Sequence, residues 1–272
     1  MRLYTTEQTE RYAEHTFAFT RLLIQDHVLR LTFARSEKKN ALHPQMVNEI
    51  AFAFQIAQDH KEVWMMLIEA EGSVFCAGAD LKAMMGLASP NDSTIPDADG
   101  EILLGELFRK LNKPVICKVA GDVYAGGFLF LAGAQIVLAA EGIKLGLPEV
   151  KRGLFPFQVM ASLLQVMPAR KVLDWCIRGY NLPVQEGERY GLITETCPPD
   201  ALDARVESVL TEMKQNSPKA VSLGLQAYDH IRPSSEQHQY LLDMFRQAMM
   251  SADGQEGMKA FREKRAPIWR GE

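Results

Sequence analysis

The sequence predicts an α/β fold, with a strand-and-helix core over residues 1–200 and a helical region over residues 201–272. Short apolar runs that suit buried strands alternate with stretches of helical spacing through the first two hundred residues. From about Ala201 onward the apolar residues recur with helical spacing only, and no further strand is expected.

The elements follow one another in the order strand, strand, helix. Residues 27–35 alternate apolar and polar side chains and predict a strand, and residues 43–58 carry apolar residues at helical spacing after Pro44. Asp80 is placed to cap a short helix. The other predicted elements are strands at 63–69, 115–119 and 136–140 and helices at 81–87, 101–111 and 128–133. Residues 89–100 are polar, acidic and rich in turn residues, and predict a mobile loop.

The bulk properties exclude several classes of protein. The 272 residues, 47% of them hydrophobic, suit one large domain or a domain with a small appendage. A net charge of −4 implies no broad field for binding nucleic acid. The four widely spaced cysteines favour reduced, buried thiols over disulfides or a zinc site.

No segment suggests a membrane span or a targeting signal. The most apolar run, residues 128–140, is too short to cross a bilayer, and the first ten residues are polar and partly acidic. We expect a soluble cytoplasmic protein.

Three stretches, residues 73–82, 113–127 and 145–156, fit together as one active site. In the first two, an apolar strand runs into a small-residue turn and then a helix. A helix start leaves backbone N–H groups unpaired, and two such donors aimed at one point make an oxyanion hole. The third stretch adds a carboxylate, Glu149, after Pro148. An oxyanion hole with a carboxylate base is equipment for enolate chemistry.

These motifs resemble those of the crotonase (enoyl-CoA hydratase/isomerase) superfamily, in the family's order. The resemblance runs from about Phe17 to the C-terminus, and the tail at 256–267 is also similar. It implies a spiral β/α core with a helical C-terminal region, and an acyl-CoA thioester as substrate.

The resemblance assigns the catalytic roles. Ala77 lies at the family's first oxyanion-hole position and Gly126 at the second, where small side chains let the thioester approach. Taken alone, each turn would instead be a tight packing of helix on strand. Glu149, partly desolvated, is expected to have a raised pKa and to act as general base; the alternative is an exposed loop glutamate.

Leu129 is the main departure from the family's hydratases, which carry a second glutamate at this position. Hydration is easiest to explain with two carboxylates, whereas isomerisation needs one base only. Members resembling Δ3,Δ2-enoyl-CoA isomerases likewise keep only the later glutamate. Phe157 stands where the family's acyl-CoA hydrolases carry an aspartate, which argues against hydrolysis. We expect Phe157, Leu129 and Met85 to wall an apolar acyl pocket.

Other positions match those that contact CoA in relatives, where tail residues reach a neighbouring subunit's CoA. A cation there would pair with phosphate, and an aromatic ring would cover adenine. The matching residues are Lys38, Ala41, Ala79, Asp80, Leu81, Phe261 and Lys264.

The sequence predicts no metal and no permanently bound cofactor. The six histidines show no ligand spacing, and no nucleotide-phosphate loop or serine-hydrolase motif is present. CoA is expected only as part of the substrate.

We expect a homotrimer or a dimer of trimers, because the family-like tail carries more apolar residues than a lone appendage would expose. These residues are Leu241, Leu242, Met244, Phe245 and Met249.

The favoured activity is double-bond isomerisation of an enoyl-CoA, with enoyl-CoA hydration as the alternative. A third possibility is a non-catalytic scaffold or an RNA-binding member of the family. Glu149 argues against the former, and the acidic balance argues against the latter. The acyl chain, the pathway and the choice between CoA and a carrier-protein thioester stay open.

Overall fold

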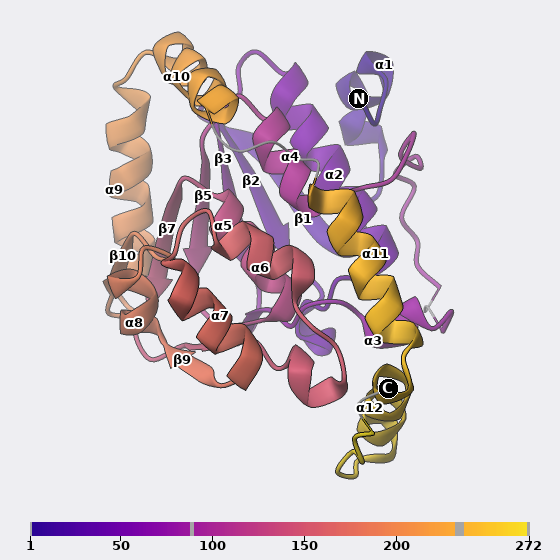
Figure 1. The fold of residues 1–272 in the computed structure, drawn as a ribbon. Helices are drawn as coiled ribbons and strands as arrows, with labels where there is room; N and C mark the ends of the chain where they lie inside the picture. The colour runs from indigo at the N-terminus through magenta and orange to yellow at the C-terminus, as the bar shows by residue number, and fades with distance from the viewer. Residues whose placement is uncertain (1, 88–89, 232–236, 271–272) are drawn as a thin grey trace.

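The computed structural model describes residues 2–87, 90–231 and 237–270, and shows an α/β core built on two sheets (Figure 1). The larger sheet has the strand order β1-β2-β3-β5-β7-β10. Its strands are β1 (Thr20–Gln25), β2 (Val28–Phe33), β3 (Met65–Ala70), β5 (Val115–Val119), β7 (Ile136–Ala140) and β10 (Glu195–Cys197). Only β1 and β2 pair antiparallel; every other pair in this sheet is parallel.

The smaller sheet has the order β4-β6-β8-β9. Its strands are β4 (Val74–Cys76), β6 (Asp122–Tyr124), β8 (Lys144–Gly146) and β9 (Asn181–Pro183). Along the chain, β3 is followed by β4, β5 by β6 and β7 by β8, so each turn of the chain adds one strand to each sheet. This alternation produces the spiral that the strand, strand, helix order predicted.

Helices cover the sheets and make up the end of the chain. They are α1 (Thr6–Glu10), α2 (Pro44–Asp59), α3 (Leu81–Met84), α4 (Leu104–Lys110), α5 (Phe128–Gly133), α6 (Phe157–Leu163), α7 (Ala169–Arg178), α8 (Val184–Arg189), α9 (Leu202–Lys214), α10 (Pro218–Ile231), α11 (Gln237–Met250) and α12 (Ala252–Glu263). Four 3-10 turns are η1 (Tyr12–Glu14), η2 (Ser36–Lys38), η3 (Ala125–Gly127) and η4 (Glu149–Arg152). After β10 the described residues form helices and no strand, as predicted, while the division into units 1–200 and 201–272 stays a prediction.

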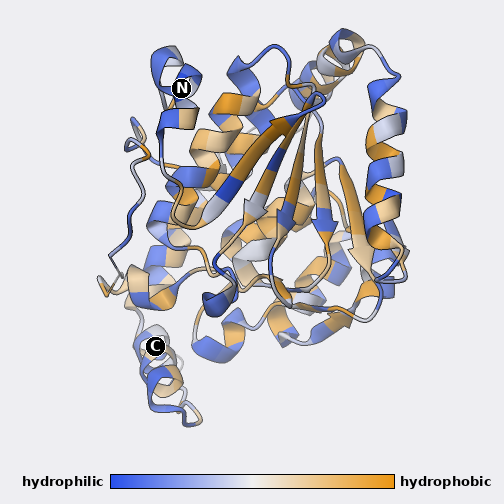
Figure 2. Cartoon of the chain, turned by 180° about the vertical axis from the view of Figure 1, so that it is seen from behind, coloured by the Kyte–Doolittle hydropathy of each residue, from blue (hydrophilic) through white to orange (hydrophobic). Residues whose placement is uncertain are grey.

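The strands of the larger sheet are strongly hydrophobic (Figure 2). Helix α2 packs against β1 and β2, α5 against β5, and α9 against β7. Helix α2 buries Met46, Ile50 and Phe54 against the core. It begins after His43, whose Nδ1 accepts a hydrogen bond from the Gln45 N–H at 3.1 Å, and Pro44 occupies the first helical turn. Sequence spacing therefore fixes both the start and the buried face of this helix.

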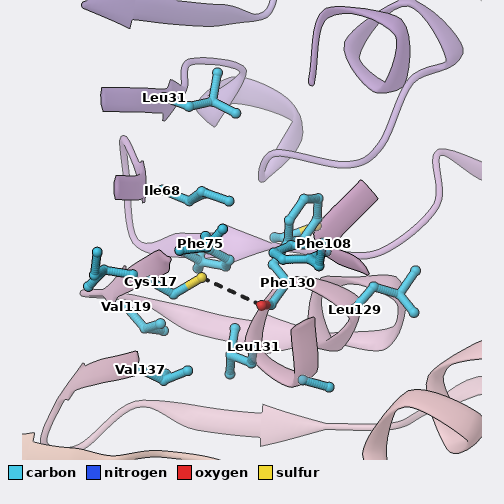
Figure 3. Packing of buried hydrophobic residues seen from close by; sticks show 14 of the residues in the cluster. Leu31, Ile68, Phe75, Phe108, Cys117, Val119, Leu129, Phe130, Leu131 and Val137 are labelled. Atoms are coloured by element: carbon cyan, nitrogen blue, oxygen red, sulfur yellow. Dashed lines mark hydrogen bonds between the residues drawn. The ribbon is translucent and has the colours of Figure 1, made fainter. Parts of the chain in front are cut away.

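Helix α5 is anchored in the middle of the core (Figure 3). The Phe130 ring packs edge-on against Phe33, with centroids 4.9 Å apart, and against Phe108 at 6.2 Å. The Cys117 thiol donates to the Phe130 carbonyl at 3.6 Å. These contacts fix the helix whose preceding turn forms part of the candidate site.

Most predicted elements are confirmed, but several elements were not predicted, among them β1, β9, β10 and the helices α6, α7 and α8. The predicted elements at 115–119, 128–133 and 136–140 match β5, α5 and β7 residue for residue, and Asp80 caps α3. Strand β1 was missed, because its hairpin turn uses Asp26 and His27, both with positive φ, instead of a glycine. Residues 90–103 form neither helix nor strand; Ser89 lies outside the described residues, and the mobility of this loop stays a prediction.

All four cysteines are buried and free of disulfides. Across the three described ranges, every helix falls short of the length and apolarity needed to cross a membrane.

Candidate active site

Two turns at the ends of neighbouring strands of the smaller sheet pack directly against each other. Gly78 lies between β4 and α3 with φ +84°, and a Cβ added there would stand 2.5 Å from the Ala125 Cβ and 3.0 Å from the Gly126 nitrogen. A side chain at residue 78 would therefore push the turns apart. Ala125 itself has φ 51°, a left-handed conformation that alanine rarely adopts and that commonly marks functional turns.

The turns leave two backbone N–H groups free at this contact. Gly126 lies in the first turn of η3, where an N–H has no partner within its own helix. In the other turn, the Leu42 N–H donates to the Gly78 carbonyl at 2.8 Å, and the Leu42 carbonyl accepts from the Asp80 N–H at 3.1 Å. The Ala79 N–H between these two bonds therefore faces away from Leu42. Within the described part of the chain, neither the Ala79 nor the Gly126 N–H has a hydrogen-bond acceptor. The Ala79 nitrogen lies 3.8 Å from the point where a Gly126 Cβ would stand.

Ala77 was predicted as the first oxyanion-hole residue, and the structure contradicts this. The Ala77 N–H donates to the Lys39 carbonyl at 3.0 Å, because the loop before α2 runs alongside β4 and takes up that donor. The free donor of this turn is Ala79, two residues later, which the sequence had suggested only as a CoA contact.

Glu149 enters the site from η4, just after β8. Its Oε2 is buried and has no hydrogen-bond partner in the described structure. Burial raises the pKa of this carboxyl to about 7, although the nearby Arg152 guanidinium works in the opposite direction. A carboxylate with such a pKa is present in both protonation states near neutral pH, which suits a general base.

These groups meet in one cavity of about 320 Å³. Its lining includes seven of the predicted site residues: Ala77, Ala79, Leu81, Gly126, Leu129, Glu149 and Phe157. Leu129 is 6% exposed on α5 and leaves an apolar wall where the hydratases carry a carboxylate. The cavity combines two free N–H donors, one buried carboxylate and mainly apolar walls.

Other predicted residues lie outside this lining. Met85 was predicted as a pocket wall and this is wrong: its side chain is 41% exposed and does not line the cavity, because α3 ends at Met84. Phe261 and Lys264 also lie outside the lining, at the end of α12.

The predicted CoA-contacting loop lies beside the turn between β4 and α3, to which Lys39 and Leu42 are hydrogen-bonded. Arg35 joins the two, since its guanidinium pairs with Asp80 at 2.8 Å and donates to the Ala41 carbonyl at 2.9 Å. Lys38 belongs to the same loop, in η2. The roles of Lys38, Ala41 and Asp80 in CoA binding stay predictions.

The sequence analysis missed several lining residues. Arg152 is three residues after Glu149, and that spacing could have indicated it. Leu242 and Phe245 also stand three apart on α11, but they had been assigned to subunit contact; instead they line the cavity of their own chain. Glu101, the first residue of the helix predicted at 101–111, gave no signal of its place in the cavity.

Comparisons with known proteins agree with this fold and site. A sequence profile described as enoyl-CoA hydratase/isomerase matches residues 24–272. The chain is 30% identical to the mevalonyl-coenzyme A hydratase sidH of Aspergillus fumigatus over 249 residues, which cover 90% of this chain and 92% of the relative. It is 30% identical over 240 residues to the probable enoyl-CoA hydratase echA8 of Mycobacterium tuberculosis, with 87% and 92% covered.

Among solved structures, a carnitinyl-CoA hydratase from Mycobacterium avium superposes with a TM-score of 0.83 at 25% identity, covering 94% of this chain and all of that one. The fold is therefore the crotonase fold. The chain belongs to the enoyl-CoA hydratase/isomerase family, and it is an enzyme of that family.

Proposed function

We propose that this enzyme isomerises the double bond of enoyl-CoA thioesters through an enolate. The observation that carries the proposal is a single buried carboxylate, Glu149, in a cavity with two free N–H donors and a leucine at position 129. Isomerisation needs one base that removes a proton and returns it at another carbon. Hydration also needs a group that orients water.

The chemistry follows from the positions of these groups. The thioester oxygen accepts hydrogen bonds from the N–H groups of Ala79 and Gly126, which stabilise negative charge on it. The Glu149 carboxylate takes a proton from C2 of a 3-enoyl thioester, and the electrons delocalise over a dienolate. The carboxyl then returns the proton to C4, leaving the conjugated 2-enoyl product with no net change in composition.

Hydration is the second candidate, because the relatives are named hydratases. It would require another group to position water. Glu101 lines the cavity, but its side chain is 53% exposed and lies 3.5 Å from the Arg246 guanidinium. We rank a non-catalytic scaffold or an RNA-binding role lower, because of the buried carboxylate and the net charge of −4.

Incubation with a 3-enoyl-CoA and, separately, a 2-enoyl-CoA tests the choice, with products identified by mass and NMR. We expect the 3-enoyl substrate to convert to the 2-enoyl product at unchanged mass. A mass gain of one water as the dominant reaction would replace isomerisation by hydration. No reaction with either thioester would overturn the proposed function.

Two further expectations belong to this proposal. We expect no permanently bound cofactor, with CoA entering as part of the substrate and the loop containing Lys38 and Ala41 contacting it. Full activity after dialysis against a chelator would support this, and reactivation only by an added cofactor would refute it. We also propose a cytoplasmic location, although some relatives are named mitochondrial; fractionation of the source cells would test it.

We propose that the protein assembles as a trimer or a dimer of trimers, but on a different surface from the one predicted. Leu241 is buried and Leu242 lines the cavity, so the apolar face of α11 packs against its own chain. Helix α10 buries none of its residues and leaves Leu223 50% and Ile231 78% exposed. Such apolar exposure suits a subunit interface. Light scattering should give three or six times 30.5 kDa, and a stable monomer at micromolar concentration would refute the assembly.

A further inference from the structure

Arg152 is a charged group in the cavity that the proposed reaction does not use. It ends the 3-10 turn η4, which begins at Glu149. Side chains three residues apart in a 3-10 helix eclipse one another, with their Cα atoms about 6 Å apart along the axis. Both side chains accordingly line the same cavity. The guanidinium is close enough to the Glu149 carboxyl for the two charges to interact.

In the ranges that the structure describes, no carboxylate lies within ion-pair distance of the guanidinium, and Glu149 acts on it only from farther away. Its Cζ lies over the Phe261 ring, 4.8 Å from the ring centroid, and no ion pair or hydrogen bond reaches the guanidinium from a described residue. Burial lowers the Arg152 pKa, and the negative charge of Glu149 only partly offsets this. A desolvated charge without a partner costs stability, so a ligand that supplies a partner would regain it.

The contacts around Arg152 hold it in place. A Cβ added at Gly257 would lie 2.1 Å from the Arg152 carbonyl oxygen, so α12 packs with its backbone directly on η4. The same helix carries the Phe261 ring that covers the guanidinium. A preorganised guanidinium, covered on one face, presents its N–H groups in a fixed fork that matches a carboxylate.

The charges around the cavity leave this position open to an anion. Glu101 lies close to Arg246, which offsets its charge. Glu149 carries only part of a negative charge near neutral pH, because its pKa is raised to about 7. The rest of the cavity lining is largely apolar and includes Phe155 and Val159. Arg152 is thus the strongest attraction for a negative group in the acyl pocket.

We propose that Arg152 binds a carboxylate carried on the acyl chain, so that the preferred substrates are monothioesters of dicarboxylic acids. This inference rests on the proposed function in one respect, namely that the cavity holds the acyl group of a CoA thioester. The nucleotide end of CoA is a less suitable partner, because Arg152 lies one 3-10 turn from the base that must reach the reacting carbons.

Calorimetric titration with saturated thioesters tests the inference without turnover. Glutaryl-CoA and adipyl-CoA carry a terminal carboxylate, and pentanoyl-CoA and hexanoyl-CoA are their methyl-terminated counterparts of equal length. We expect the wild type to bind each carboxylate at least about tenfold more tightly, as a charge-assisted, partly buried pair should. Arg152→Leu should abolish the preference, and Arg152→Lys should keep part of it.

Lys151→Met is the matched control. Lys151 is the neighbouring cation, but it is exposed and does not line the cavity, so its loss should leave the preference unchanged. Circular dichroism verifies that each variant folds. If Arg152→Leu does not fold, the inference is still tested by Arg152→Lys and by the ratio of the wild-type affinities for carboxylate and methyl-terminated thioesters. Equal affinities in the wild type, or a preference that survives Arg152→Leu, would overturn the inference while leaving the proposed function intact. If none of the four thioesters binds, the cavity is not an acyl-CoA site and the proposed function fails as well.

Discussion

Glu149 and Leu129 occupy comparable positions on two walls of one cavity, yet they supply opposite chemistry. Glu149 begins the 3-10 turn η4, which follows β8 of the smaller sheet. Leu129 lies in α5, which follows β6 of the same sheet through the 3-10 turn η3. One oxygen of the Glu149 carboxyl is buried and unpaired in the described structure, whereas Leu129 completes an apolar surface. The same apolar surroundings that suit a leucine raise the pKa of the carboxyl to about 7.

This comparison shows why a single carboxylate at this site is informative. A low-polarity cavity strengthens hydrogen bonds to a developing oxyanion, and it also makes each buried charge expensive. One base in such a cavity can move a proton between carbons. A second carboxylate at position 129 would be desolvated in the same way. Because leucine stands there, we expect the site to be less efficient in reactions that need two carboxylates.

The largest expected effect comes from removing the base. Glu149→Gln should reduce kcat by about 10²- to 10⁴-fold while leaving CoA binding intact, because it removes a general base without changing the shape of the side chain. Glu141→Gln, on an exposed turn, is the matched control and should behave as the wild type. Unchanged kinetics in a folded Glu149→Gln protein would remove this residue from the mechanism.

The same variant should be more stable than the wild type at high pH. The folded-state pKa of Glu149 is raised from 4.5 to about 7, so the fold favours the protonated form. Between these values the wild type loses stability as pH rises, and above about pH 7 the full loss is present, up to about 3 kcal/mol. Urea denaturation at pH 5 and pH 8 measures this; a stability difference between variant and wild type that does not grow with pH would contradict it.

The next effect concerns the N–H groups of Ala79 and Gly126, the proposed oxyanion donors of the cavity that Glu149 and Leu129 line. Ala79→Pro removes the N–H that has no partner in the described structure, and we expect kcat to fall by about 10²- to 10³-fold. Ala77→Pro, two residues earlier, removes a donor already bonded to Lys39 and should mainly lower the melting temperature. If Ala79→Pro folds and keeps full activity while Ala77→Pro folds and loses it, the oxyanion donor is the Ala77 N–H and not the Ala79 N–H.

A smaller effect is the pH dependence of the wild type. Since the base must be deprotonated to act, kcat/KM should fall about tenfold for each pH unit below about 7 and level off above it. The rate should be followed from pH 5 to 9 with a 3-enoyl-CoA. A rate independent of pH between 5 and 7 would show that the carboxyl is not the titrating group.

The elements around the site could be predicted where local sequence decides the structure. Strand β5 and helix α5 are apolar runs bounded by turn residues, and their limits follow from that pattern. The hairpin of β1 and β2 could not be predicted in this way, because Asp26 adopts positive φ without a glycine signal. The turn is tight, with Gln25 paired to Val28, but it carries none of the residues by which such a turn is usually recognised.

The roles at the site divide in the same way. Gly126 and Glu149 were predicted from motifs that place each residue after a strand, and both line the cavity, while their catalytic roles stay predictions. The choice between Ala77 and Ala79 could not be made, because it depends on which N–H a separate loop occupies through Lys39. Arg152 was missed, since its role depends on the cavity and on the ring that α12 brings to it.

The smallest and most delicate effect tests the Leu129 wall itself. Leu129→Glu should raise the hydration of a 2-enoyl-CoA without abolishing isomerisation, if the absent carboxylate is what limits hydration. The gain should be modest, because a carboxyl placed among apolar side chains is desolvated and its pKa rises. Leu129→Gln, with a similar shape and no charge, is the matched control.

The ratio of the two reactions in the wild type gives the sharper answer, because it requires no disturbed packing. A 3-enoyl-CoA in deuterated water should yield the conjugated 2-enoyl product, with deuterium entering wherever the proton on Glu149 exchanges before its return. Hydration would instead give a 3-hydroxyacyl-CoA from the 2-enoyl substrate. Rapid hydration with no detectable isomerisation would defeat the isomerase proposal. Another polar group of the cavity would then have to do the work of the carboxylate that is missing at position 129. Glu101 would be the first residue to substitute in a search for that group.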